Sequence, residues 1–226
     1  MMRFALPLVV ILPCAAMADD HLPEIVVAAT GTVSAAPDMA TVTVGVSHEA
    51  PTAAEAMAAL AATSAAVLEE VKSLGIEERD VQTSSLNLNP VWDQGNTRTP
   101  SVRGYTASGM LSVRVRDLDS LGALLDDVTN EGANRLNGLI FGISDRDPLE
   151  DQARRDAVLR AKAKAETLAA AAGVRLGPVQ RITEGTQSAT PTPMMRGAMM
   201  EAASMPIASG ELEVRVSVTV TFAIAE

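Results

Sequence analysis

The sequence has almost no cysteine and very few aromatic residues. Its single cysteine is Cys14, and only five of its 226 residues are Trp, Tyr or Phe. Disulfides, thiolate nucleophiles and thiolate metal ligands would therefore all depend on one position near the N-terminus. With so few aromatic rings, a folded core has to be built from the aliphatic side chains of Ala, Val, Leu and Ile.

The chain is also poor in positive charge. It carries 18 basic residues against 28 acidic ones, which gives a formal net charge of −10. A chain this acidic repels the phosphate backbone of nucleic acids and lacks the basic surface that binds anionic lipids. We therefore expect no nucleic-acid partner.

Residues 1–18 have the layout of a secretory signal peptide. Arg3 supplies the positive charge, Leu6 to Leu12 form the apolar run, and Ala16-Met17-Ala18 is a small-residue cleavage site. The run is too short to cross a bilayer as a helix. We expect cleavage after Ala18, export to the periplasm, and a mature chain without cysteine or transmembrane segment. Lipid attachment at Cys14 is the alternative, but Pro13 stands where that reaction requires a small residue.

Motifs of common catalytic sites are missing. The sequence contains no G-x-S-x-G, G-x-G-x-x-G, P-loop or H-E-x-x-H pattern. Of its two histidines, His21 lies near the start of the mature chain and His48 precedes Glu49. Neighbours on a strand point to opposite faces, so we interpret His48 as a solvated surface residue rather than a base oriented by Glu49. The pairs Glu69-Glu70 and Asp126-Asp127 are interpreted as solvated helix faces, with a divalent-cation site as the alternative. We expect no enzymatic activity and no cofactor.

The most regular stretch runs from Asn137 to Gly173 and predicts a strand, a turn and a long helix. Asp147 is the expected N-cap, Pro148 suits the first helical position, and Glu150 completes a capping box. Gly173 suits the helix end. The predicted apolar stripe consists mostly of alanine: Ala153, Ala157, Ala161, Ala165, Leu168 and Ala172. Because alanine has little bulk, this helix is expected to lie close against a sheet.

The remaining pattern predicts two further helices and six further strands. The helices span residues 52–74 and 117–132, and the strands span residues 24–34, 41–47, 81–92, 104–116, 179–184 and 212–224. The first two strands flank the turn Ala36-Pro37-Asp38 and are expected to form a hairpin. Strands with one polar face alternate with helices, which favours an α+β fold. We expect an antiparallel or mixed sheet with three helices packed on one face, in the order ββαββαβαββ.

Methionine is concentrated between residues 185 and 210, a stretch rich in Ala, Pro, Ser and Thr that predicts a long mobile surface loop. Five methionines lie within twelve residues: Met194, Met195, Met199, Met200 and Met205. Thioethers are soft ligands that suit Cu(I), and they oxidise reversibly. The favoured interpretation is an adaptable apolar loop that docks on a partner or on its own domain. A copper or oxidant site is the alternative.

Two further sets of polar residues have a functional and a structural interpretation. Arg103, Arg114, Arg116 and Arg215 stand on predicted polar strand faces, where they could bind an anion or line a pore; pairing across strands with Glu211 and Glu213 is favoured. Tyr105 could donate a proton, but an aromatic residue on a buried strand face is more often part of the core.

Five short motifs, taken in order, resemble the SIMPL domain family, a bacterial family of unknown function. They are Gly31 to Asp38, Gly75-Ile76 with Val81-Gln82-Thr83, Gly104 to Ala107, Gly138 to Phe141 with Ser144-Asp145, and Gly210 to Val214. The resemblance covers essentially the whole mature chain. It implies a periplasmic or envelope protein of α+β fold, associated with oxidative or envelope stress, in a family with ring-forming members and no catalytic residues. Leu60 departs from the polar residue, commonly Asn, expected in the first helix.

Together these observations predict one SIMPL-like domain over residues 19–226. The expected function is that of an exported, self-associating, non-enzymatic envelope protein of stress tolerance; a Cu(I)-binding or oxidant-responsive protein is the alternative. The last strand is long and free of Pro and Gly, so it must be central, covered or paired with another subunit. We expect a homo-oligomer in the periplasm. Association with the outer membrane and a protein partner in the envelope are left open.

Overall fold

A computed structural model describes residues 23–93, 101–185, 192–194 and 207–225. Its three α-helices are α1 (Ala53–Ser73), α2 (Leu121–Asn130) and α3 (Asp147–Ala172). Its strands are β1 (Glu24–Ala35), β2 (Met39–Ala50), β3 (Val81–Trp92), β4 (Val102–Val115), β5 (Arg135–Gly142), β6 (Arg175–Glu184), β7 (Thr192–Met194) and β8 (Glu211–Ala225). The predicted α+β class and element order are confirmed, with the short strand β7 in addition.

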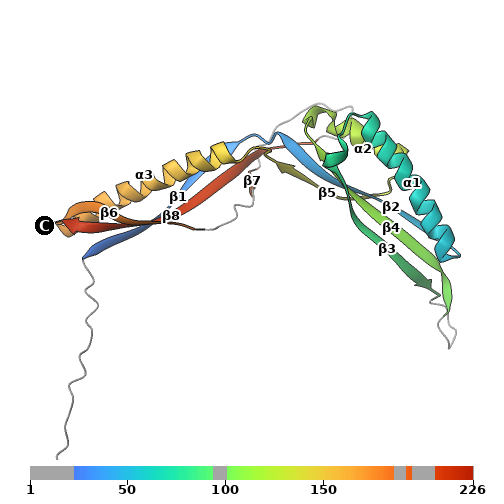
Figure 1. Cartoon of the computed structure of the whole chain (residues 1–226), viewed down its shortest axis with the longest axis horizontal. Helices are drawn as coiled ribbons and strands as arrows, with labels where there is room; N and C mark the ends of the chain where they lie inside the picture. Colours follow the sequence, from blue (N-terminus) through green and yellow to red (C-terminus); the bar gives the residue numbers. More distant parts are fainter. Residues whose placement is uncertain (1–22, 94–100, 186–191, 195–206, 226) are drawn as a thin grey trace, which may run out of the picture.

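The strands form two antiparallel sheets rather than the one sheet expected. In the first, β8 lies between β1 on one side and β6 and β7 on the other. In the second, the order is β3-β4-β2-β5. Each sheet has its own hydrophobic core under its own helices. We call the first sheet with α3 the α3 lobe, and the second sheet with α1 and α2 the α1 lobe; Figure 1 shows them end to end.

In the α3 lobe, the alanine stripe brings α3 close to β1 and β8. Ala153, Ala157, Ala161 and Ala165 are fully buried, as predicted, and Ala169 continues the stripe. The predicted members Leu168 and Ala172 are exposed instead, because the buried positions keep a strict spacing of four residues along the helix. The helix ends at Gly173, whose φ of 71° is left-handed.

In the α1 lobe, α1 lies over the two central strands, β2 and β4. Its predicted capping box is confirmed: the Thr52 side chain accepts from the Glu55 N–H, and the Glu55 carboxylate accepts from the Thr52 N–H. The buried face of α1 consists of Ala56, Leu60, Val67 and Val71. Because α1 is centred on β2 and β4, the edge strand β3 receives little cover.

Two local predictions were wrong. The strands β1 and β2 do not form a hairpin; the chain continues from one sheet into the other, where β1 pairs with β8 and β2 pairs with β4 and β5. Asp147 does not cap α3, because Arg146 occupies the N-cap position, and the Arg146 side chain makes no capping hydrogen bond. Pro148 does stand in the first turn, as expected.

The last strand, β8, is central. It is hydrogen-bonded to neighbours along both sides, so its long regular pattern serves the interior of a sheet. The predicted loop 185–210 is interrupted by β7, which pairs Thr192 to Met194 with Glu211 to Glu213 of β8. Near the end of the segment 185–210, Ile207 packs against the core of the α1 lobe.

Candidate association surfaces

Most of the residues considered for chemistry have structural partners. His48 is half-buried rather than solvated, and its Nε2 lies 2.9 Å from the Thr63 hydroxyl of α1. Tyr105 packs against the core of the α1 lobe, as favoured above. Among the described residues, no group of three or more His, Cys, Asp or Glu side chains is placed to hold a metal ion.

The four arginines of interest all form ion pairs, although mostly not the predicted ones. Arg215 pairs with Glu213 at 2.7 Å, along β8 rather than across strands. Arg103 pairs with Glu49 at 2.8 Å. Arg114 and Arg116 converge on one carboxylate, that of Asp80. These contacts place the arginines in structural pairs.

Asp80 is the most deeply buried of the charged side chains in these ion pairs. Arg116 donates two hydrogen bonds to it, from Nε at 2.9 Å and from Nη2 at 3.0 Å. Arg114 Nη1 lies 3.5 Å away. The hydrogen bond from Arg116 lowers the pKa of Asp80, burial opposes this, and the charges of both arginines lower it further. The carboxylate is thus kept ionised to fasten the start of β3 to the end of β4.

The methionine cluster is mostly outside the described residues. Met194 lies in β7, where its backbone pairs with Glu211. Met195, Met199, Met200 and Met205 lie outside the described residues, as do His21 and the signal segment 1–18. The copper-binding alternative and the cleavage site therefore stay predictions.

Exposed apolar side chains mark the edges of the sheets. Of the twelve large apolar residues that are most exposed among the described ones, eight lie on edge strands: Val26 on β1, Leu86, Leu88 and Trp92 on β3, Leu136 and Ile140 on β5, and Val179 and Ile182 on β6. Edge strands also have one row of backbone groups outside the sheet's own ladder. Apolar surface and unpaired backbone thus coincide at the edges, which makes them candidate association surfaces.

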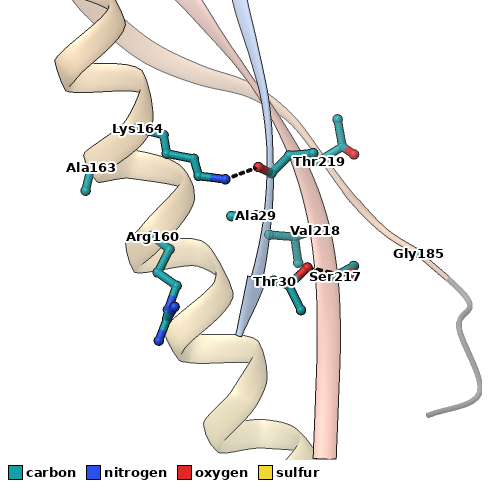
Figure 2. Close-up of a pocket in the computed structure, with 10 residues that line it drawn as sticks. Ala29, Thr30, Arg160, Ala163, Lys164, Gly185, Ser217, Val218 and Thr219 are labelled. Carbon is teal, nitrogen blue, oxygen red and sulfur yellow. Dashed lines mark hydrogen bonds between the residues drawn. The ribbon is translucent and has the colours of Figure 1, made fainter. Parts of the chain in front are cut away.

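The edge of β1 is the exception, because α3 covers part of its backbone. Asp156 Oδ2 accepts from the Thr32 N–H at 3.2 Å, and Lys164 Nζ donates to the Ala28 carbonyl at 2.9 Å. Figure 2 shows Lys164 reaching from α3 towards β1, beside a cavity of about 540 Å³. Arg160, which also lines this cavity, pairs with Asp156 at 2.8 Å. Both cations are thus engaged with the protein itself.

Two other cavities lie beside edge strands of the α1 lobe. One, of about 250 Å³, lies between α1 and the β3–β4 pair and is mostly apolar. The other, of about 640 Å³, lies between α2 and β5 and includes Asp126, Arg135 and Leu136. No helix among the described residues is long and apolar enough to cross a membrane.

Comparison with known proteins assigns the family. The SIMPL family model, described as a protein of unknown function (DUF541), matches residues 25–222. This chain belongs to the SIMPL family. The match spans both lobes and all three helices.

Named relatives of this SIMPL chain come from several bacteria. The 26 kDa periplasmic immunogenic proteins of Brucella melitensis biotype 1 and Brucella abortus (strain S19) are each 40% identical to it over 211 residues, covering 89% of this chain and 84% of the relative. The uncharacterized protein YggE of Escherichia coli (strain K12) is 30% identical over 189 residues, covering 84% and 76%.

Proposed function

We propose that this SIMPL-family chain is an exported periplasmic protein that self-associates through its sheet edges and has no enzymatic activity. Its role, on this proposal, lies in tolerance of oxidative or envelope stress. The signal-like segment 1–18 and the two Brucella relatives named as periplasmic support the location. The observation that carries self-association is the concentration of exposed apolar residues on edge strands.

The proposed contact joins β6 of one copy to β5 of the next. Ile140 on β5 is 71% exposed, and Val179 and Ile182 on β6 are each about half exposed. Burying apolar area of this kind stabilises a contact by about 25 cal/mol per Å² before the entropy of association is subtracted. The central strand β8 is excluded as the contact, because both of its sides are already paired.

Charge favours a head-to-tail arrangement of this kind. Residues 39–142, the α1 lobe, contain 13 acidic and 7 basic residues, a net charge of −6. The α3 lobe, residues 24–35, 147–184 and 211–225, contains 9 acidic and 8 basic residues, a net charge of −1. A contact between β6 and the α2–β5 side of the acidic lobe therefore involves less repulsion than a contact between two α1 lobes. Because it uses two different surfaces, such a contact closes into a ring or extends into a filament.

Light scattering on a size-exclusion column tests self-association. The mature chain should have a mass of several chains, and Ile140→Asp should lower it, because an unpaired charge would be buried at the contact. The matched control is Leu159→Asp, which is 67% exposed on the face of α3 opposite its buried alanines and which should leave the mass unchanged.

Two results would contradict the proposed contact. A mass near that of one chain over about a hundredfold range of concentration would rule out self-association under those conditions. An unchanged oligomer in the Ile140→Asp and Ile182→Asp variants would place the contact elsewhere. For the physiological role, a strain lacking this chain should survive peroxide less well, and the parent chain should restore survival where Ile140→Asp does not.

A further inference from the structure

The edge strand β3 lacks the charged residues that commonly protect an edge. Natural edges are blunted by charged residues, prolines, bulges or covering side chains. The β1 edge is covered by Asp156 and Lys164 of α3. In contrast, β3 has no charged residue over its twelve positions. It has Pro90 near its end and register shifts between Thr83 and Ser85 and between Val91 and Trp92, but its pairing with β4 is regular from Ser85 to Asn89.

Backbone groups of β3 point out of the sheet at Leu86 and Leu88. The Gly45 carbonyl of β2 accepts from the Asn134 N–H on the β5 side, so the backbone of the next residue, Val46, faces β4. Gly109 of β4 pairs with Val46 on one side and with Leu86 on the other, so its backbone faces β2 and that of Leu86 faces away from β4. Leu88, two residues further along the strand, faces the same way as Leu86. An extended chain laid along β3 would find the N–H and C=O of both leucines available for a ladder.

The same stretch offers apolar contacts beside the backbone. Leu86 is 60% exposed and Leu88 is 42% exposed. Next to Leu86, the cavity of about 250 Å³ between α1 and β3 is lined mainly by Met57, Leu60, Leu68, Met110 and Leu111. Methionine side chains adapt to apolar groups of different shape. An added strand would thus bring backbone bonds and one side-chain pocket together, which is how β-augmentation sites obtain affinity and specificity.

Charge decides between two occupants of this edge. A second copy of this chain, paired β3 to β3, would bring together two lobes that each carry a net charge of −6. At the start of β3, Glu77 pairs with Arg79, and Asp80 pairs with Arg114 and Arg116, so these ion pairs leave the net charge of the lobe unchanged. Two lobes of this net charge repel each other, whereas a basic partner is attracted.

We propose that β3 from Ser85 to Asn89 binds a basic, extended polypeptide segment as an added strand, with one apolar side chain of that segment in the α1–β3 cavity. The partner has apolar residues at alternate positions and Lys or Arg between them. This site is separate from the proposed self-association through β5 and β6, and does not depend on it.

Binding is measured on the full mature protein with a synthetic peptide of alternating leucine and lysine, about nine residues long. Trp92 is the only tryptophan of the chain, lies at the end of β3 and is 53% exposed, so its emission reports on this edge. We expect saturable one-to-one binding, a blue shift of the Trp92 emission, and weaker binding at higher salt. A peptide of alternating leucine and glutamate should not bind.

Matched variants locate the site. Leu86→Lys adds a charge to the edge and should weaken peptide binding about tenfold or more. Leu159→Lys, on the outer face of α3, should bind as the parent does, and circular dichroism checks that both variants are folded. Ile140→Asp, the variant that tests self-association, should also bind the peptide as the parent does. Each of the two proposals can therefore be contradicted without affecting the other.

Three results would overturn the proposal. Equal binding of the glutamate peptide would show that charge does not select the partner. Equal binding to Leu86→Lys would place the site elsewhere. If Leu86→Lys alone, without peptide, converts an oligomer into single chains, then a second copy occupies β3 and the basic partner is wrong.

Discussion

Asp80 shows how one buried carboxylate joins distant parts of the α1 lobe. Its side chain is 3% exposed, and it receives the bidentate hydrogen bonds of Arg116. Exposed ion pairs contribute little to stability, but this carboxylate is withdrawn from water and fully engaged. Removing its charge leaves the two arginine side chains without their shared partner.

We predict that Asp80→Asn lowers the free energy of unfolding at pH 7 by about 1–3 kcal/mol. The pKa of Asp80 is lowered in the folded state from its ordinary value of 3.8. Its contribution is therefore complete above that value and is lost as the pH falls through the folded pKa. The difference between parent and variant should shrink below about pH 4. Urea unfolding at pH 7 and at lower pH measures this, with the exposed Asp126→Asn as control; equal stability of parent and Asp80→Asn at pH 7 would contradict it.

At the scale of elements, the contact of α3 with β1 depends on small residues on both sides. Opposite the alanine stripe stands Gly31. A Cβ there would overlap the Ala153 carbonyl oxygen and lie 2.5 Å from the Ala157 nitrogen. Since both are backbone atoms of a helix, neither can turn away. The close approach therefore requires a residue without a side chain at this point of β1.

We predict that Gly31→Ala lowers the free energy of unfolding by about 1–3 kcal/mol or more, because α3 has to move off the sheet. The control is Gly185→Ala, where an added Cβ would meet nothing nearer than the Ser217 oxygen at 3.6 Å. Urea unfolding followed by circular dichroism compares the three proteins. If Gly31→Ala is as stable as Gly185→Ala, the helix tolerates displacement and the close contact carries little energy.

At the scale of the molecule, a pair of polar residues joins the two links between the lobes. Asp38 lies between β1 and β2, and Ser144 lies between β5 and α3. The Ser144 N–H donates to Asp38 Oδ1 at 2.7 Å, its hydroxyl donates to Oδ2 at 2.5 Å, and the Asp38 N–H donates to the Gly142 carbonyl at 3.1 Å. Two of the motifs that resemble the family thus meet at the junction.

We predict that Asp38→Ala widens the range of angles between the lobes while both cores stay folded. A chain that starts at Asp19 has no cysteine, so spin labels can be attached at Glu69→Cys on α1 and Leu159→Cys on α3, both exposed sites. The distance distribution between the labels, measured in an excess of unlabelled chain, should broaden in Asp38→Ala and not in the neighbouring Asp145→Ala. An unchanged distribution would show that the lobes are held by other contacts.

Local features of the helices could be predicted from the sequence because they involve residues only a few positions apart. The capping box of Thr52 and Glu55, the alanine spacing of α3 and the left-handed end at Gly173 follow from such short-range interactions. The N-cap predicted at Asp147 was wrong even though it rested on a local pattern, because Arg146 before it adopts a helical conformation and takes the N-cap position.

The pairing of strands was decided only in the tertiary structure. Thr30 and Ser217, 187 residues apart, lie side by side, whereas β1 and β2, adjacent in sequence, belong to different sheets. Leu86 and Leu88 are exposed because α1 is centred on β2 and β4, which the pattern of residues 81–92 does not indicate. Which strand becomes an edge depends on the summed packing of segments far apart in the chain, and no short window of sequence contains that sum.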